Sequence, residues 1–298
     1  MRPHLMWDVQ TLLGEGPIWL PWQRALWFVD IKGGALHKYM PDTGRHQTLS
    51  CGGKPSFVVA AEDGSLLVGS ENTVSRLQSA NFGSPVITIT MPARNRTNDA
   101  TVDDRGRLWF GTMDDDEGLA SGALYCLDRA TLHHMGCSAI VTNGPAISAD
   151  GRTLYHVDTV ARTIWRYVVA EANEGPRLER GEVFVRFEDG KGYPDGVVLD
   201  SEECLWVGVW DGWAVHRYAP DGRLLARIEL PCARVTKVAF GGNDLRTCFV
   251  TTARIGLSET ELLRQPQAGG LFAFEVPVAG RTLPPVKLLE CSARRRHT

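Results

Sequence analysis

The sequence predicts an all-β fold: a six-bladed β-propeller with four antiparallel strands in each blade and a central channel. Three observations lead to this prediction. A hydrophobic pair of residues recurs at intervals of roughly 40 to 51 residues, which is the period of propeller blades. A turn rich in Asp, Gly or Asn precedes most of the pairs. Apolar and polar side chains alternate in the runs around each pair, which is typical of half-buried strands.

The six pairs are expected to lie in the second strand of each blade. They are, in chain order, Leu26-Trp27, Leu66-Leu67, Leu108-Trp109, Leu154-Tyr155, Leu205-Trp206 and Cys248-Phe249. A further alternating run follows several of them, at 35–39, 122–127, 163–167 and 214–218. The copies cover nearly the whole chain, so we expect one propeller domain over residues 1–298.

Two segments outside the repeat also carry predictions. We expect residues 6–12 and 286–289 to lie together in one blade and to close the ring, because a closed ring has no free sheet edge. Ser258 is followed three residues later by Glu261. This capping-box pattern predicts one or two helical turns over residues 258–264.

The composition is that of an ordinary soluble globular protein. Apolar residues make up 43% and charged residues 22%, and the formal net charge is -3, so we expect neither nucleic acid nor a membrane surface as a partner. No apolar run approaches the roughly 20 residues that span a bilayer. The seven cysteines form no Cys-x-x-Cys pair, and the N-terminus lacks a signal-peptide profile. We therefore expect a reduced, cytoplasmic protein, either a monomer or a weak homo-oligomer.

One polar residue stands roughly 10 to 12 positions before each hydrophobic pair, at the start of an otherwise largely apolar strand. The six residues are Glu15, Ser56, Asn98, Asn143, Asp195 and Thr236. The innermost strand of each blade lines the channel and begins at one rim. This register therefore predicts six polar side chains that converge on a single pocket.

Within this set, Glu15, Asn143 and Asp195 predict a metal site. Two carboxylates at one buried rim need a cation, and carboxylate and amide oxygens are hard donors that suit Ca, Mg, Mn or ferrous iron. No histidine occupies a rim position, which argues against a His-rich zinc site. For any one of these residues alone, the alternative is a strand cap or a hydrogen bond to a neighbouring blade.

Five short motifs resemble those of a known family. They are Leu13-Gly14-Glu15-Gly16-Pro17-Ile18-Trp19, Arg96-Thr97-Asn98-Asp99, Gly111-Thr112-Met113, Thr142-Asn143-Gly144-Pro145 and Tyr193-Pro194-Asp195-Gly196. In this order, over about residues 12–256, the chain resembles the SMP-30/gluconolactonase/regucalcin family, especially its bacterial pentono- and xylonolactonases. Ala100 and Pro145 depart from the residues most common in the family, but neither departure removes a donor oxygen.

The resemblance implies a six-bladed propeller with one divalent metal ion at the channel mouth and activity on sugar lactones. Glu15, Asn143 and Asp195 would be the metal ligands, and Asp195 would also be the general base. The metal varies within the family, so Fe(II), Ca, Zn and Mn all stay open. A pentonolactone such as xylonolactone or arabinonolactone, opened to the aldonic acid, is the expected substrate.

The resemblance also implies a substrate-binding group. Arg96 and Asn98 would contact sugar hydroxyls, together with an acidic residue that falls best on Asp116 in the crowded acidic loop 114–117. Trp210 and Trp213 are candidates for an apolar wall over the substrate, with inter-blade packing as the alternative. Other functions stay open: a gluconolactonase or hexonolactonase, a phosphotriesterase-type esterase, or a non-enzymatic calcium-binding regulatory propeller. The polar rim favours an enzyme.

Overall fold

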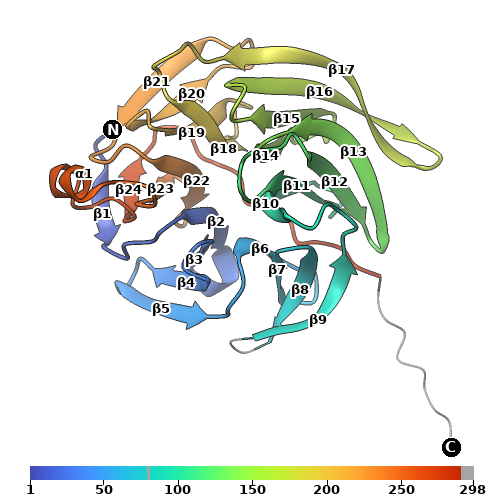
Figure 1. Cartoon of the computed structure of the whole chain (residues 1–298), viewed down its shortest axis with the longest axis horizontal. Coiled ribbons are helices and arrows are strands. Elements are labelled where there is room, and N and C mark those ends of the chain that lie inside the picture. Colours follow the sequence, from blue (N-terminus) through green and yellow to red (C-terminus); the bar gives the residue numbers. More distant parts are fainter. Residues whose placement is uncertain (79–80, 290–298) are drawn as a thin grey trace, which may run out of the picture.

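The chain forms a six-bladed β-propeller in a computed structural model that describes residues 1–78 and 81–289 (Figure 1). Within these residues, 24 strands pair into six antiparallel sheets of four strands each. The innermost strands contact one another in a ring around the channel, in the order β22, β2, β6, β10, β14, β18. The predicted fold class is confirmed.

Five blades are continuous in sequence. The first contains β2 (Gly14–Leu20), β3 (Ala25–Asp30), β4 (Ala35–Met40) and β5 (Arg45–Ser50), with a short 3-10 turn, η1 (Pro21–Gln23). The second contains β6 (Pro55–Ala60), β7 (Leu66–Ser70), β8 (Thr73–Gln78) and β9 (Asn81–Thr88). The third contains β10 (Asn95–Val102), β11 (Leu108–Asp114), β12 (Gly122–Asp128) and β13 (Thr131–Ala139). The fourth contains β14 (Thr142–Ile147), β15 (Thr153–Asp158), β16 (Thr163–Ala172) and β17 (Gly175–Arg186). The fifth contains β18 (Tyr193–Leu199), β19 (Leu205–Trp210), β20 (Ala214–Tyr218) and β21 (Leu224–Glu229).

The sixth blade joins the two ends of the propeller. It contains β22 (Val235–Gly241), β23 (Thr247–Thr252), β24 (Leu271–Glu275) and, at its outer edge, the N-terminal strand β1 (His4–Trp7). The expectation that residues 286–289 would join this blade is wrong. β1 already occupies the free edge of β24, and Val286 instead forms a parallel bridge with Ala61 of the second blade.

The hydrophobic pairs lie in the second strand of every blade, as predicted. Trp109 and Trp206 are fully buried in equivalent places, and each indole Nε1 donates to an aspartate of the preceding turn, Asp103 and Asp200, at 2.9 and 2.8 Å. A buried indole N–H needs such a partner. The Asp-rich turns therefore do more than reverse the chain, because they also fix the large aromatic side chains between the blades.

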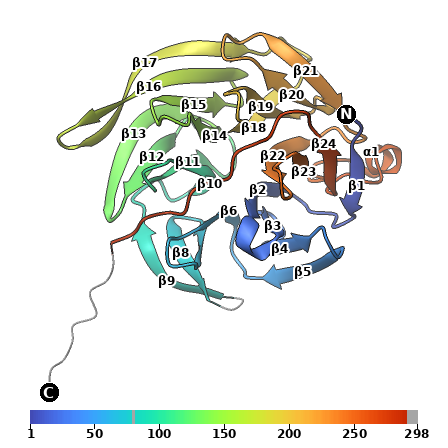
Figure 2. The ribbon, with the colours of Figure 1, turned by 180° about the vertical axis from the view of Figure 1, so that it is seen from behind.

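The chain after β24 crosses the far end of the channel (Figure 2). We call residues 279–288 the strap. The Ala279 carbonyl accepts from Ser201 in the fifth blade, the Val286 N–H donates to the second blade at 2.8 Å, and the Lys287 N–H donates to the third blade at 2.8 Å. The strap closes the channel opposite the strand starts, so the pocket at those starts has one mouth.

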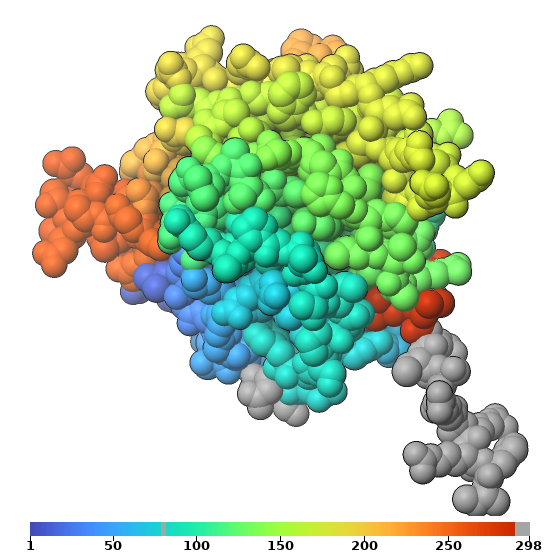
Figure 3. All heavy atoms as spheres, turned by 45° about the vertical axis from the view of Figure 1, so that its right-hand side comes forward, coloured from blue at the N-terminus to red at the C-terminus, as the bar shows by residue number. Residues whose placement is uncertain are grey.

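The predicted helical turn is present as α1 (Glu259–Arg264), which stands out at one edge of the molecule (Figure 3). Ser258 and Glu261 form the expected capping box. No helix among residues 1–78 and 81–289 has the length and apolar character to cross a membrane. Six of the seven cysteines are free thiols, and Cys291 lies outside the described residues.

We expect the buried side chain of His156 on β15 to lower the stability of the protein in acid. Its side chain is buried, and neither ring nitrogen has a hydrogen-bond partner among the described residues. Burial lowers its pKa from 6.5 to about 4, so the unfolded chain takes up a proton that the folded chain refuses as the pH falls between these values. We expect His156→Leu to remove about 2 kcal/mol of the stability loss between pH 7 and pH 5. Urea unfolding of both proteins at the two pH values measures it. An equal loss in both would show that His156 is not the acid-sensitive group.

Candidate functional site

A pocket of about 520 Å³, lined by both polar and apolar side chains, opens at the strand-start end of the channel. Four of the six predicted rim residues line it: Glu15, Asn98, Asn143 and Asp195. They come from β2, β10, β14 and β18, so four separate blades contribute to one site. The opening also includes Arg96, Trp210 and Arg234.

A register shift in each inner strand accompanies these side chains. The pairing of β2 with β3 shifts between Glu15 and Ile18, and the corresponding shifts in the fourth and fifth blades follow Asn143 and Pro194. Such a bulge bends the strand and changes the direction in which a side chain points. Gly16 and Gly144 have positive φ values of 53° and 68° at the shifts, a conformation that glycine adopts at little cost.

Ser56 and Thr236, the other two rim residues, bond to neighbouring blades and do not line the pocket. The Ser56 hydroxyl lies 2.7 Å from the Thr97 hydroxyl of the third blade. The Thr236 hydroxyl donates to the Gly14 carbonyl of the first blade at 2.7 Å. For these two positions the alternative of an inter-blade hydrogen bond is the correct one.

The two carboxylates are buried and act on each other electrostatically. Glu15 and Asp195 are each 5% exposed. Burial, assisted by the charge of Asp99, raises the pKa of Glu15 to about 8. Burial and the charge of Glu15 raise the pKa of Asp195 well above its usual value. The Oδ1 atom of Asp195 has no hydrogen-bond partner within residues 1–78 and 81–289. The positive charges of Lys237, which acts on both groups, and of Arg96, which acts on Glu15, do not offset this rise.

A chain of hydrogen bonds fixes the orientation of the Asn143 amide. Its Nδ2 donates to the Thr159 hydroxyl at 2.9 Å, and this hydroxyl donates to the Pro194 carbonyl at 2.9 Å. A carbonyl cannot donate, so the hydroxyl must accept from Asn143. The Asn143 Oδ1 atom therefore points the other way, where it accepts from Asn98 Nδ2 at 2.8 Å and keeps a second lone pair.

Arg96 is held at the pocket wall by several partners. Its Nε donates to Asp115 at 2.6 Å, and its Nη1 donates to Asn98 Oδ1 at 2.7 Å. Asp115 also accepts from Lys32 at 2.8 Å and from Lys54. These three cations hold the pKa of the Asp115 carboxyl well below its usual range. No hydrogen bond within the described part of the chain uses Arg96 Nη2, which leaves this donor for a ligand.

The structure places Asp116 differently from the expectation. Asp116 points outward, with its side chain 69% exposed and 2.9 Å from Arg94, and it lies beside a neighbouring hollow. Glu117 is the residue of the acidic loop that lines the pocket. Its φ of 55° turns the chain at this residue. The sequence contains four consecutive acidic residues, so it does not indicate which of them lies at the turn. Trp210 lines the pocket, and Trp213 does not.

The residues at the pocket fit a hard divalent cation. The described residues contain no group of three His, Cys, Asp or Glu side chains placed to hold a metal ion, but Asn143 supplies the third oxygen beside the two carboxylates. The unpartnered Asp195 oxygen and the raised pKa values of both carboxyl groups are the features that a bound cation would remove. The donor set contains only carboxylate and amide oxygens, as calcium, magnesium and manganese prefer.

Comparisons with known proteins extend these observations. The family described as SMP-30/Gluconolactonase/LRE-like region matches residues 13–254. The chain is 35% identical over 280 residues to the pentonolactonase XacC of Haloferax volcanii, covering 92% of this chain and 94% of that protein. It is 34% identical over 286 residues to 6-deoxy-6-sulfogluconolactonase of Pseudomonas putida, covering 92% and 94%. The solved structure of a calcium-binding protein, regucalcin, from Agrobacterium tumefaciens aligns with a TM-score of 0.86 and 29% identity over 96% of this chain and 97% of that chain.

Proposed function

The chain belongs to the SMP-30/gluconolactonase/LRE-like family, and from this premise we propose that it hydrolyses a sugar aldonolactone to the aldonic acid with one divalent metal ion. The observation that carries the proposal is the convergence of Glu15, Asn143 and Asp195 at one pocket. Two similar proteins are named as lactonases, which supports cleavage of the same kind of bond.

Glu15, Asn143 and Asp195 would hold the metal ion. A divalent ion bound there would supply Lewis-acid polarisation of the lactone carbonyl. The two carboxylates would then have the opposite charge that their burial requires. The calcium-binding relative supports a cation at this site, and calcium, ferrous iron, manganese and zinc are all candidates.

Asp195 would act as the general base. A water molecule attacks the lactone carbonyl carbon, and an Asp195 carboxylate oxygen accepts the proton that this water loses. The bond between the carbonyl carbon and the ring oxygen then breaks. The proton returns from Asp195 to that oxygen, which becomes the hydroxyl group of the open aldonic acid. The carboxylate has two oxygen atoms, so one would bind the metal ion while the other takes the proton.

Arg96 and Asn98 would orient the sugar. Arg96 is fixed by Asp115 and keeps Nη2 free, so it can donate to a sugar hydroxyl without reorganising. Asn98 bridges Arg96 and Asn143, and so couples the sugar-binding wall to the proposed metal ligands. This wall suits a polyol better than an apolar ester.

We place pentonolactones such as xylonolactone or arabinonolactone first among the substrates. The pentonolactonase relative, similar over nearly the whole of both chains, supports this choice. A pocket of about 520 Å³ is of the size used for small-molecule ligands. Gluconolactone and other hexonolactones are the second choice.

A substrate and metal panel tests the proposal. The protein is stripped by chelation, reloaded with Ca, Mn, Zn or ferrous iron, and assayed by proton release on pentono- and hexonolactones. We expect acceleration over spontaneous hydrolysis with at least one metal, and the highest kcat/KM with a pentonolactone. Hydrolysis of a phosphotriester with no lactone hydrolysis would favour the esterase. Metal binding without any turnover would favour the non-enzymatic propeller.

Substitutions in the acidic loop distinguish Glu117 from its neighbour. We expect Glu117→Gln to raise KM for the lactone about tenfold, with a smaller change in kcat, because one hydrogen bond to a charged group contributes roughly 1.5 kcal/mol or more. Asp116→Asn is the matched control and should leave both constants unchanged, since this side chain points away from the pocket. Steady-state kinetics on both variants decides the assignment, and the reverse pattern would restore Asp116 to the substrate-binding role.

A further inference from the structure

A second layer of residues lies one step into the channel from the rim. The residues that directly follow the six rim positions are Gly16, Phe57, Asp99, Gly144, Gly196 and Lys237. Three of them are glycines, so the layer has space for long side chains. A Cβ atom on Gly196 would lie 2.5 Å from Cγ of Lys237. The lysine side chain therefore runs through the space that this glycine leaves.

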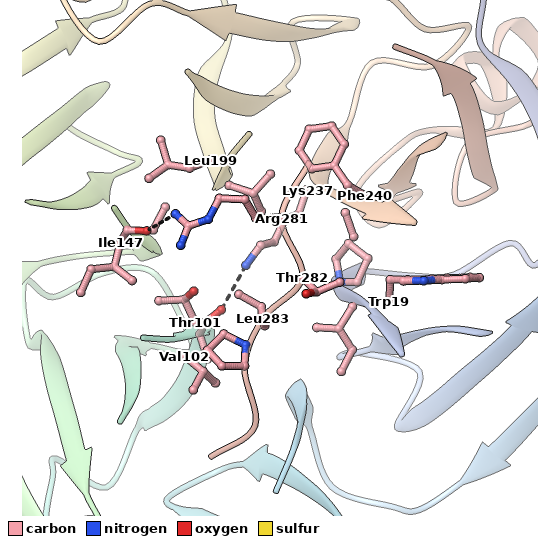
Figure 4. Close-up of a pocket in the computed structure, with 17 residues that line it drawn as sticks. Trp19, Thr101, Val102, Ile147, Leu199, Lys237, Phe240, Arg281, Thr282 and Leu283 are labelled. Carbon is pink, nitrogen blue, oxygen red and sulfur yellow. Dashed lines mark hydrogen bonds between the residues drawn. The ribbon is translucent and has the colours of Figure 1, made fainter. Parts of the chain in front are cut away.

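Lys237 and Asp99 form an ion pair across this layer. Their strands, β22 and β10, lie opposite each other in the ring of inner strands (Figure 1). The Lys237 Nζ atom lies 2.5 Å from Asp99 Oδ1 and 3.2 Å from the Ala100 carbonyl. The side chains are 5% and 2% exposed. Figure 4 shows a second cavity, which lies between this layer and the strap. Lys237 extends into it toward Thr101 and Val102 of the third blade, and Arg281 and Thr282 of the strap line it as well.

The ion pair is electrostatically coupled to the proposed metal ligands. The positive charge of Lys237 opposes the rise in the pKa of both Glu15 and Asp195, whereas the charge of Asp99 adds to it. Asp99 Oδ2 has no hydrogen-bond partner among the described residues, so this oxygen of the ion pair is left without a local contact.

The charges in this buried region can be counted. Glu15, Asp99 and Asp195 contribute three negative charges when ionised, and Lys237 contributes one positive charge. The cations Arg96, Lys32 and Lys54, which share Asp115 at the wall, stand outside this count. The four counted side chains therefore carry two net negative charges, and one divalent cation would neutralise them.

We propose that Lys237 is a positioning residue that sets the charge of the metal site, so that the site matches a divalent cation. This inference rests on the metal site of the proposed function, and it does not depend on the lactone being the substrate. A neutral side chain at 237 would leave a net charge of −3 while Asp99 stays ionised. A neutral side chain at 99 would leave a net charge of −1. Replacing both restores −2.

A purely structural ion pair makes a different prediction. If Lys237 and Asp99 only hold the third and sixth blades together, each substitution damages the site, and the double substitution damages it at least as much. If they set the charge, the second substitution repairs the metal affinity that the first one lowered. Metal affinity of the double variant separates these two roles.

The test measures Mn²⁺ binding by isothermal titration calorimetry to chelator-stripped wild type, Asp99→Asn and Asp99→Asn/Lys237→Met. We expect Asp99→Asn to weaken Mn²⁺ binding by at least about tenfold, because a unit charge in a partly buried site acts strongly on a divalent ion. The double variant should return to within about threefold of the wild-type affinity. Lys237→Arg, which keeps the charge, should bind Mn²⁺ like the wild type. Circular dichroism verifies that each variant is folded. Asp99→Asn/Lys237→Gln is a second double variant in which both charges are removed.

The outcomes are distinct. Double variants that bind Mn²⁺ no better than Asp99→Asn would refute the charge-setting role of Lys237, and so would double variants that do not fold. Wild-type protein that binds no divalent cation would refute the metal site itself, and this inference with it. Wild-type protein that binds Mn²⁺ but opens no lactone would overturn the proposed reaction and leave the charge-setting role intact.

Discussion

Asp195→Asn is expected to lower kcat for lactone hydrolysis by at least about a thousandfold. Asp195 is the proposed base, and a positioned base contributes roughly 10²–10⁴-fold to a rate. It is also a proposed ligand, so the substitution removes two contributions at once. Excess metal should not restore the rate, because saturating the site cannot replace the base. Steady-state assays at rising metal concentration measure this.

The same substitution should stabilise the metal-free protein. Asp195 is buried beside Glu15, and its Oδ1 atom has no partner in the described chain. A neutral amide removes a carboxyl group whose ionisation the fold disfavours. We expect a higher melting temperature than that of stripped wild type.

An aspartate in the same blade provides the control. Asp221 lies in the turn between β20 and β21, and its side chain is 68% exposed. Asp221→Asn should change neither kcat nor the melting temperature. An Asp195→Asn protein that is folded and still turns over lactone at a near-normal rate would exclude Asp195 as the base.

The regular part of the fold could be predicted because each blade repeats the same local signals. Leu108-Trp109 after an Asp-rich turn specifies a second strand without knowledge of the other blades, and the period then gives the number of blades. The strap could not be predicted in this way. Its partners, such as Ala60 and Gly106, are distant in sequence, and residues 286–289 contain no copy of the repeat.

The position of the site could be predicted because register is a local property. Glu15, Asn143 and Asp195 begin inner strands, and the glycine after each one marks the bulge that directs the side chain into the channel. By contrast, neighbouring residues alone do not determine how far a side chain reaches into the pocket or where the acidic loop turns. Whether Asp115, Asp116 or Glu117 enters the pocket depends on the backbone turn and on cations from other blades.

The ion pair of Lys237 and Asp99 follows the same register, but the sequence pattern does not distinguish it. Moving the rim register forward by one residue gives both side chains. A lysine in a strand ordinarily indicates solvent exposure, so Lys237 alone carries no signal. Its meaning comes from the facing aspartate in the opposite blade, and from glycines such as Gly196 that leave space for its side chain.

Glu15→Gln is expected to weaken binding of the divalent ion by at least about a hundredfold, since it removes a buried charged ligand next to the cation. Glu15 has no proposed part in proton transfer, so kcat at saturating metal should stay within about tenfold of the wild-type value. Titration calorimetry and metal-dependent kinetics measure the two quantities. Glu229→Gln, whose side chain is 78% exposed in the native protein, is the control.

The pH dependence of metal binding gives a second readout of Glu15. Burial raises the pKa of this carboxyl to about 8, so in the metal-free protein it holds a proton at pH 7 that a bound cation must displace. Metal affinity of the wild type should therefore increase as the pH rises from 7 to 9, where the proton is lost beforehand. Glu15→Gln cannot lose this proton and should show a smaller increase. Unchanged metal affinity together with a collapsed kcat would mean that Glu15 acts on the substrate or its proton, because the loss of a ligand weakens binding before it affects a saturated enzyme.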